Sequence, residues 1–263
     1  MNFLEKNEQS LSQEFLNTGY LIRKSENLQS IRLIRKIILQ STKKYLNTKK
    51  NINLNNIHKF ISIKELNSFR LQIINDLSNN KNLRLNYFNI ARKHLYAIAG
   101  NELMMQRNIN LSIQFPNDKG SLLPVHSDVW SGDSPYEINL WLPLVDCYRT
   151  KSMYLLPQKK YNKFEKRIHY EKNKSSSQIY KRISKDVKWM NIKYGSFLLF
   201  NQSLPHGNVV NKEKETRWSL NCRFKSIFSP YLDKKIGEFF LPITTRAATE
   251  IGINYKSPFK DLK

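Results

Sequence analysis

The segment Leu123-Pro124-Val125-His126-Ser127-Asp128 places two metal-capable side chains, those of His126 and Asp128, one residue apart. It follows a turn signal at Pro116-Asn117-Asp118 and precedes an aromatic-rich run. On a strand, residues i and i+2 point to the same side, so His126 and Asp128 can face one metal ion together. The segment therefore predicts part of a metal site that is carried by a β-sheet.

The chain around this segment has the pattern of an antiparallel β-fold. From about residue 108, short β-type runs alternate with Pro, Gly, Asn and Asp. These runs cover residues 109–115, 136–144, 152–156, 187–192, 195–200 and 217–228. The tryptophans all lie in this half of the chain, as expected for packed sheets. Short strands with frequent turns indicate a sandwich or barrel rather than βαβ units.

Residues 1–105 instead predict helices packed against that β core. Apolar residues recur with a helical period at 28–46, 57–77 and 85–98, and Gly100-Asn101 is a plausible helix stop. One short strand, Gly19-Tyr20-Leu21-Ile22, is expected among them. Without an interdomain linker, we predict a single domain over 1–263. It has a helical annex (1–105), a β core (106–230) and a C-terminal extension (231–263).

Residues 158–188 differ from the rest of the core. They hold eleven basic and three acidic residues, together with the run Ser175-Ser176-Ser177. This composition predicts a partly mobile helical insertion between strands. It is either a solvated excursion or a lid over the site.

The composition favours a basic protein of the cytoplasm. The formal charge of +23 comes mostly from lysines spread along the chain, which indicates a solvated basic surface, although a polyanion-binding face stays open as an alternative. Cys147 and Cys222 are expected to be reduced, unpaired thiols. No signal peptide and no membrane span are predicted, and no nucleic-acid partner is expected.

Two downstream residues complete a possible metal site. His206 follows on another strand-like run, and Arg217 comes eleven residues later. Two imidazoles and one carboxylate are the ligand set of a non-haem iron(II) site with open positions. The arginine supplies a fixed cation for an acidic cosubstrate. The remaining histidines, at 58, 94 and 169, receive no role.

The pattern His126-x-Asp128 … His206-x10-Arg217 resembles the signature of iron(II)/2-oxoglutarate-dependent oxygenases, specifically the phytanoyl-CoA dioxygenase-like branch. Flanking segments resemble the same family, namely residues 15–21, 114–116, 123–128, 139–144, 204–208 and 217–219. The resemblance implies a double-stranded β-helix, a cupin-like jelly roll, packed against the N-terminal helices. Within the branch, the chain looks closest to oxygenases of carbohydrate and aminosugar gene clusters.

The resemblance also implies the cofactors and their contacts. Iron(II) would be held by the two histidines and the aspartate, and would bind 2-oxoglutarate and O2. The distal carboxylate of 2-oxoglutarate would meet Arg217, with Ser219 on the same side of the strand. Arg223 lies on the same side of that strand as Arg217 and is an alternative partner for the distal carboxylate. The amides of Gln114, Asn139 and Asn208 are further candidate contacts to the cosubstrate or to the ligands.

The predicted reaction is hydroxylation of a small polar metabolite, such as a sugar, with release of succinate and CO2. Related halogenases have a small residue at the carboxylate position, so Asp128 disfavours halogenation. The segment 149–158 departs from the family pattern in a region that often shapes the substrate pocket. Two alternatives stay open: a cupin-type metal enzyme that does not use 2-oxoglutarate, and a non-enzymatic polyanion-binding module.

Overall fold

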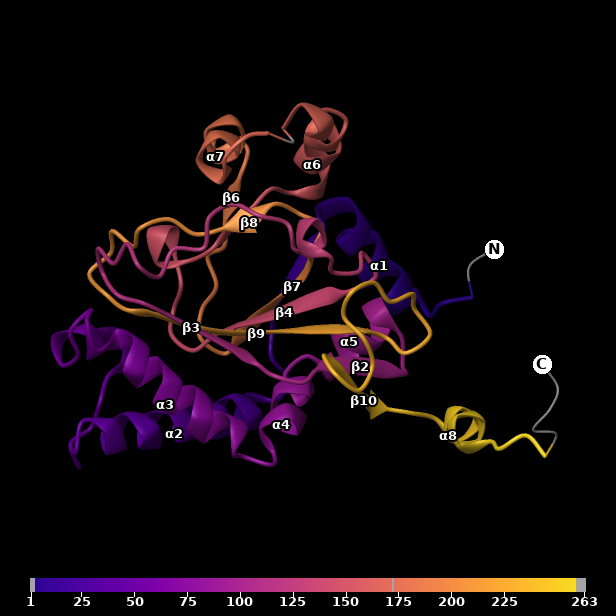
Figure 1. Cartoon of the computed structure of the whole chain (residues 1–263), viewed down its shortest axis with the longest axis horizontal. Helices are drawn as coiled ribbons and strands as arrows, with labels where there is room; N and C mark the ends of the chain where they lie inside the picture. The colour runs from indigo at the N-terminus through magenta and orange to yellow at the C-terminus, as the bar shows by residue number, and fades with distance from the viewer. Residues whose placement is uncertain (1–2, 172, 259–263) are drawn as a thin grey trace.

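Two antiparallel β-sheets face each other and form the body of the protein (Figure 1). The structure is a computed structural model that describes residues 3–171 and 173–258. The major sheet has the order β1-β7-β4-β9-β2-β10, with β3 paired to β9 beside this path, and the minor sheet has the order β6-β5-β8. The major sheet comprises β1 (Tyr20–Lys24), β2 (Leu103–Gln106), β3 (Asn110–Gln114), β4 (Ile138–Pro143), β7 (Ser196–Asn201), β9 (Arg217–Ser226) and β10 (Phe240–Thr244). The minor sheet comprises β5 (Tyr154–Leu155), β6 (Lys188–Trp189) and β8 (His206–Gly207). The predicted β-rich core with a helical annex is confirmed.

Strand β9 positions the functional half of the major sheet. On one edge it pairs first with β3 and then with β2, and on the other edge it pairs with β4. Alternate residues of a strand share a face. Trp218 and Phe224 are fully buried and contact Phe69 and Phe88 of the helical layer. The alternate residues of β9, starting with Arg217, therefore face the space between the sheets.

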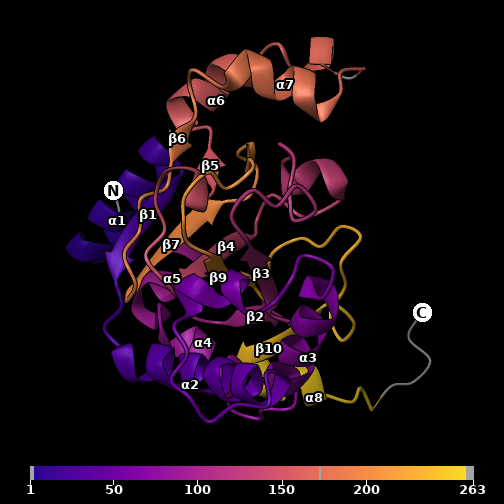
Figure 2. The ribbon, with the colours of Figure 1, turned by 90° about the vertical axis from the view of Figure 1, so that its left-hand side faces the viewer.

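The N-terminal helices after the first cover the face of the major sheet that points away from the minor sheet, and the first helix lies beside β1 (Figures 1 and 2). The N-terminal helices are α1 (Lys6–Thr18), α2 (Leu28–Tyr45), α3 (Leu66–Ser78), α4 (Leu83–Asn89) and α5 (Arg92–Ala99), with the short helix η1 (Leu54–Lys59) between α2 and α3. Helix α2 buries Ile31, Ile34 and Ile38 against this layer. The predicted helices at 28–46 and the stop at Gly100 are confirmed, since Gly100 caps α5 with a φ of 98°.

Two of the predicted helices are interrupted. The run 57–77 divides into η1 and α3, and at the break the Ser62 backbone and hydroxyl both donate to the Glu65 carboxylate. The run 85–98 divides into α4 and α5, and the Ser25 hydroxyl donates to the Ile90 carbonyl at the break. The first break has a local signal in the sequence, Ser-x-x-Glu at residues 62–65. The second depends on the contact of Ser25 with Ile90, which lie far apart in the sequence.

The basic insertion is helical, as predicted, and lies beyond the minor sheet (Figures 1 and 2). It forms α6 (Gln158–Glu165), η4 (Ile168–Glu171) and α7 (Ser176–Ile183). Ser175 and Gln178 cap α7 reciprocally, which explains where that helix starts. The role of this insertion as a lid over the site stays a prediction.

The C-terminal extension adds to the fold. Its strand β10 pairs with β2, and the helix α8 (Ala247–Asn254) follows. Neither β2 nor β10 was predicted from the sequence. Cys147 and Cys222 are buried free thiols, as expected. None of the described helices has the length and apolar character needed to cross a membrane.

Candidate active site

His126 and His206 are brought together by their own backbones. The His126 amide donates to the His206 carbonyl over 3.0 Å, and the His206 amide donates to the His126 carbonyl over 2.8 Å. This pairing joins the loop after β3 to strand β8, and places the two imidazole centroids 4.3 Å apart. The motif residue and the distant histidine thus meet, as the sequence predicted.

The expected local geometry of Asp128 is wrong in one respect. Asp128 begins the short helix η2 (Asp128–Ser131) instead of continuing a strand. Ser127 before it keeps an extended backbone, with φ −121° and ψ 136°. Because this one residue is extended, the side chains on either side of it still share a face, and His126 Nε2 lies 3.5 Å from Asp128 Oδ1.

Both imidazoles present the same nitrogen to this cluster. Nδ1 of His126 donates to the Pro124 carbonyl over 2.9 Å, and Nδ1 of His206 donates to the Leu204 carbonyl over 2.8 Å. A carbonyl oxygen only accepts, so each Nδ1 carries a proton, and in the neutral form of each ring Nε2 keeps its lone pair. Such backbone contacts fix the orientation and tautomer of metal-binding histidines.

The charge states also suit a metal site. Burial lowers the pKa of His206 to about 4, so this ring is neutral at physiological pH. Burial opposes the ionisation of Asp128, but the hydrogen bond with His126 and the charges of His206 and Arg223 hold its pKa well below the usual range. Burial likewise lowers the pKa of His126, and the contact with Asp128 more than offsets it, so the pKa rises. A neutral imidazole and an ionised carboxylate are the forms that bind metal, so His206 and Asp128 are in the binding form, whereas a protonated His126 would release its proton on binding.

Among the described residues, His126, Asp128 and His206 form the one group of such side chains close enough to hold a metal ion. Their ligand atoms all lie within 4.8 Å of one another. Two imidazole nitrogens and a carboxylate oxygen suit non-haem iron(II) and leave further coordination positions open. The residues present therefore fit the metal that the sequence resemblance implies.

Arg217 is a buried cation without an acidic partner. Its Nη2 donates to the Ser112 hydroxyl over 2.8 Å and its Nη1 to the Ser152 carbonyl over 3.4 Å, while Nε is buried and has no hydrogen-bond partner. No carboxylate of the described residues pairs with it. Burial lowers the pKa of Arg217 to about 10, so the side chain is still charged at neutral pH. An unpaired buried charge is costly, and an acidic ligand would relieve that cost.

A small cavity contains both Arg217 and the metal-site residue His206. It is lined by Ser112, Leu123, Trp141, Met153, Phe200, His206, Gly207, Asn208, Arg217, Ser219 and Asn221. Its volume is about 70 Å³, whereas pockets for small molecules measure roughly 300–1,000 Å³. The side chain of Leu123 is exposed and that of Met153 is intrinsically flexible. A five-carbon keto acid would therefore fit only if lining side chains such as these moved.

The three candidate amides occupy different places. Asn208 lines the cavity, but its oxygen accepts from the Leu123 amide over 2.6 Å. Gln114 donates to the Val209 carbonyl over 2.8 Å, outside the cavity lining. Asn139 donates to Asp128 Oδ2 over 3.4 Å, and its own oxygen is buried without a partner. Contacts of these amides with a cosubstrate stay predictions.

Ser112 and Arg223 make contacts in the site that the sequence did not predict. Ser112 pairs in register with Ser219 across β3 and β9, and it holds Arg217. Arg223, expected to compete for the cosubstrate, lies 3.1 Å from Asp128 Oδ1 and 3.4 Å from Asp133 Oδ2. Strand parity alone could not reveal either contact, because both depend on segments more than 90 residues apart.

The fold and these three converging side chains define a class: a double-stranded β-helix protein with a metal-capable His-x-Asp … His site. No protein-family model and no curated protein matches the sequence. Solved structures of non-haem enzymes do match its fold.

One similar structure is titled a non-haem monooxygenase, the ThoJ–Ni complex, with a TM-score of 0.57 and 12% identity over 90% of this chain and 84% of that chain. Another is SnoK, a non-haem α-ketoglutarate-dependent carbocyclase from nogalamycin biosynthesis, with a TM-score of 0.54 and 13% identity over 92% of this chain and 97% of that one. A third is EctD from S. alaskensis in its apo form, with a TM-score of 0.54 and 12% identity over 88% and 80%. These similarities confirm the predicted fold.

Proposed function

We propose that this protein is an iron(II)- and 2-oxoglutarate-dependent oxygenase. The observation that carries the proposal is the shared cavity, which holds a metal-site histidine, His206, and an unpaired buried cation, Arg217. A metal site alone would fit many enzymes. The guanidinium of Arg217 is buried beside that site, and no carboxylate of the described residues pairs with it. This arrangement favours an acidic molecule that binds next to the metal.

The proposed metal ligands are Nε2 of His126, Nε2 of His206 and the carboxylate of Asp128. Bound iron(II) with 2-oxoglutarate and O2 would supply oxidation of a substrate C–H bond, with succinate and CO2 released. Arg217 would hold the distal carboxylate of the keto acid by charge-assisted hydrogen bonds, and its free Nε–H is a donor that no described residue uses. Ser219 lines the same cavity and would add its hydroxyl.

Apolar side chains close the cavity around these polar groups. Trp141, Met153 and Phe200 are buried and line it, and the Phe200 ring stands edge-on to His206 at 4.9 Å. They would exclude water, which strengthens the pairing of Arg217 with an acidic ligand. The protein's own contribution is thus to hold, orient and desolvate the reactants.

For the substrate, we propose a small polar metabolite such as a sugar or a sugar-linked intermediate, with hydroxylation as the reaction. The carboxylate of Asp128 fills the metal position that a halide would need, which favours oxygen transfer over halogenation. The carbocyclase SnoK has a similar fold, so the same scaffold accommodates other outcomes. Product analysis by mass spectrometry therefore has to accompany any turnover assay.

The decisive experiment titrates 2-oxoglutarate into the iron(II) protein without oxygen and records the visible absorption band of the iron–keto acid chelate. Succinate release is then measured after air is admitted. We expect the band in the wild type and its absence in His126→Ala. Metal-dependent turnover that needs no keto acid would instead identify a cupin-type enzyme and overturn the proposal.

A further inference from the structure

Helix α2 carries a row of cations on its outward face. Residues 32, 35, 36, 39, 40 and 43 recur at helical spacing and lie on one side, opposite the buried Ile31, Ile34 and Ile38. Four of them are basic: Arg32, Arg35, Lys36 and Lys43. None of the four forms an ion pair with any described residue.

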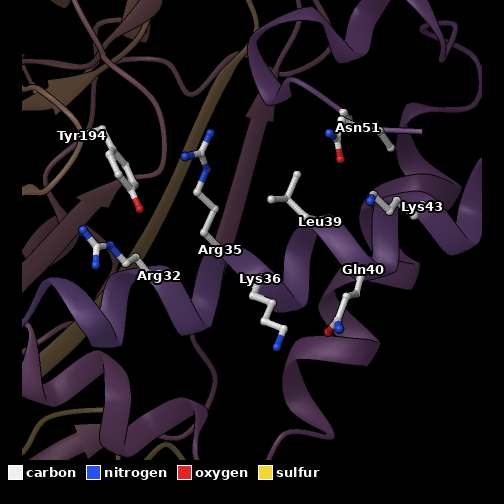
Figure 3. A pocket seen from close by; sticks show the side chains of 9 residues that line it. Arg32, Arg35, Lys36, Leu39, Gln40, Lys43, Asn51 and Tyr194 are labelled. Carbon is white, nitrogen blue, oxygen red and sulfur yellow. The ribbon is translucent and has the colours of Figure 1, made fainter. Parts of the chain in front are cut away.

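This row borders a hollow that shares no lining residue with the metal cavity. The α2 residues form one wall, while Asn51, Ile52 and Tyr194 complete the lining (Figure 3). The hollow has a volume of about 500 Å³ and no acidic side chain lines it. Figure 3 shows Tyr194 beside the guanidinium groups of Arg32 and Arg35.

The arrangement of Arg35 distinguishes the hollow from an ordinary solvated surface. Its guanidinium lies over the Tyr194 ring, 4.8 Å from the centroid, and its Nε is buried without a hydrogen-bond partner. Arg32 lies three residues before Arg35 and four before Lys36, and like charges at these helical spacings repel. Elsewhere the basic side chains of Lys93 and Lys160 have carboxylate partners. A bound anion would supply the missing partner here.

The shape of the hollow indicates the ligand. From Arg32 to Lys43 the row extends roughly 16 Å along the helix, at about 1.5 Å per residue. A single phosphate is too short to engage such a row. The volume lies in the range of small-molecule sites, roughly 300–1,000 Å³. Leu39 and Ile52 provide apolar surface, and Tyr194 provides an aromatic ring for a flat group.

We propose that this hollow binds a nucleoside di- or triphosphate. The phosphates would lie along the α2 cations, with Arg35 Nε as one of the donors, and the base would contact the apolar and aromatic lining. The site is separate from the proposed oxygenase site, so it does not depend on that function.

Calorimetric titrations of the metal-free full chain with ATP, ADP and inorganic tripolyphosphate test this proposal at near-physiological salt. We expect ATP to bind, and the double variant R35Q/K36Q to weaken it by roughly tenfold or more, because charge-assisted contacts are lost. The matched control is K64Q/K119Q, which removes the same charge at two exposed lysines. It should leave ATP affinity within about twofold, since surface charges at a distance are screened. Thermal melts verify that all variants fold.

The variant Tyr194→Ala separates a nucleotide from a bare polyphosphate. It should weaken ATP more than tripolyphosphate, because only ATP carries a base to contact the ring. The proposal would be overturned if R35Q/K36Q and K64Q/K119Q lost ATP affinity equally, or if tripolyphosphate bound to the wild type as tightly as ATP. Binding to RNA alone would also overturn it. None of these titrations requires iron or keto acid. A failure of the nucleotide proposal therefore leaves the oxygenase proposal unaffected, and a failure of the oxygenase proposal leaves the nucleotide proposal unaffected.

Discussion

The guanidinium of Arg223 lies 3.1 Å from Oδ1 of Asp128, the proposed carboxylate ligand, and 3.4 Å from Oδ2 of Asp133. Its Nε donates to Gln202 over 3.1 Å, and Lys234 lies 2.7 Å from Asp133. Arg223 is therefore a partly buried link between two carboxylates. Such partners orient metal ligands and contribute to metal affinity.

We expect Arg223→Gln to weaken iron(II) binding by roughly 10- to 100-fold, as the loss of an orienting partner typically does. Arg223→Lys should keep more of the affinity because it keeps the charge. Metal titration under anaerobic conditions measures both. If Arg223→Gln binds iron like the wild type and loses 2-oxoglutarate instead, then Arg223 rather than Arg217 holds the cosubstrate.

For Arg217, we expect opposite effects on ligand binding and on stability. Burial lowers its pKa, so the folded state disfavours the charged form relative to the unfolded chain. That cost is fully present below a pH of about 10 and declines only as the pH rises from there toward the ordinary pKa of arginine, so it applies at neutral pH. Arg217→Met should raise the free energy of unfolding by about 1 kcal/mol and weaken 2-oxoglutarate by roughly a hundredfold.

Urea unfolding and keto-acid titration of the iron(II) protein check the two effects of Arg217→Met. Arg217→Lys serves as the control that keeps a cation but loses the planar fork, and it should retain intermediate affinity. A Met variant that is both less stable and unchanged in keto-acid affinity would show that Arg217 has only a structural role.

Ser219 should contribute less than Arg217. A neutral hydroxyl adds about 1 kcal/mol to a binding contact, so Ser219→Ala should weaken 2-oxoglutarate by roughly fivefold without changing iron affinity. The keto-acid affinity of Ser112→Ala is the comparison for that of Ser219→Ala, since Ser112 accepts a hydrogen bond from Arg217 and lines the same cavity. Equal affinity for the keto acid in Ser219→Ala and wild type would remove Ser219 from the proposed cosubstrate site.

The sequence predicted the parts of this site that depend on local pattern. The pattern grouped His126, Asp128 and His206, and the structure brings these three side chains together. Strand parity placed Arg217 and Ser219 on one face of a strand, where both line the cavity, while their roles stay predictions. Parity could not predict that Asp128 starts a helical turn, because the backbone pairing of His126 with its distant partner decides where the extended segment ends.

Two strands escaped prediction for opposite reasons. Strand β2 is buried on both faces, so its residues Leu103–Gln106 show no alternation. Strand β10 is an edge strand that contains Pro242 and a register irregularity beside it, features that weaken a strand pattern. Contacts such as Ser112 with Arg217 depend on the register between β3 and β9, which local sequence does not encode.

Gly207 should be essential for the geometry of both histidines. A Cβ at this position would lie 2.7 Å from the Leu123 carbonyl oxygen and 3.1 Å from that of Pro124. The Pro124 carbonyl accepts the Nδ1 proton of His126, so any shift of this backbone moves that ring. We expect Gly207→Ala to lower the free energy of unfolding by about 1–3 kcal/mol, the usual cost of overpacking, and to weaken iron(II) by roughly tenfold.

Gly252→Ala is the matched control, because a Cβ there would meet nothing within 4 Å and the residue lies in helix α8. It should leave iron affinity unchanged and stabilise the helix by up to about 1 kcal/mol. Anaerobic metal titration and urea unfolding of both variants provide the comparison. Wild-type iron affinity in Gly207→Ala would mean that the segment 123–126 adjusts without moving the His126 ring. The contact of His126 with the Pro124 carbonyl would then not control the metal site.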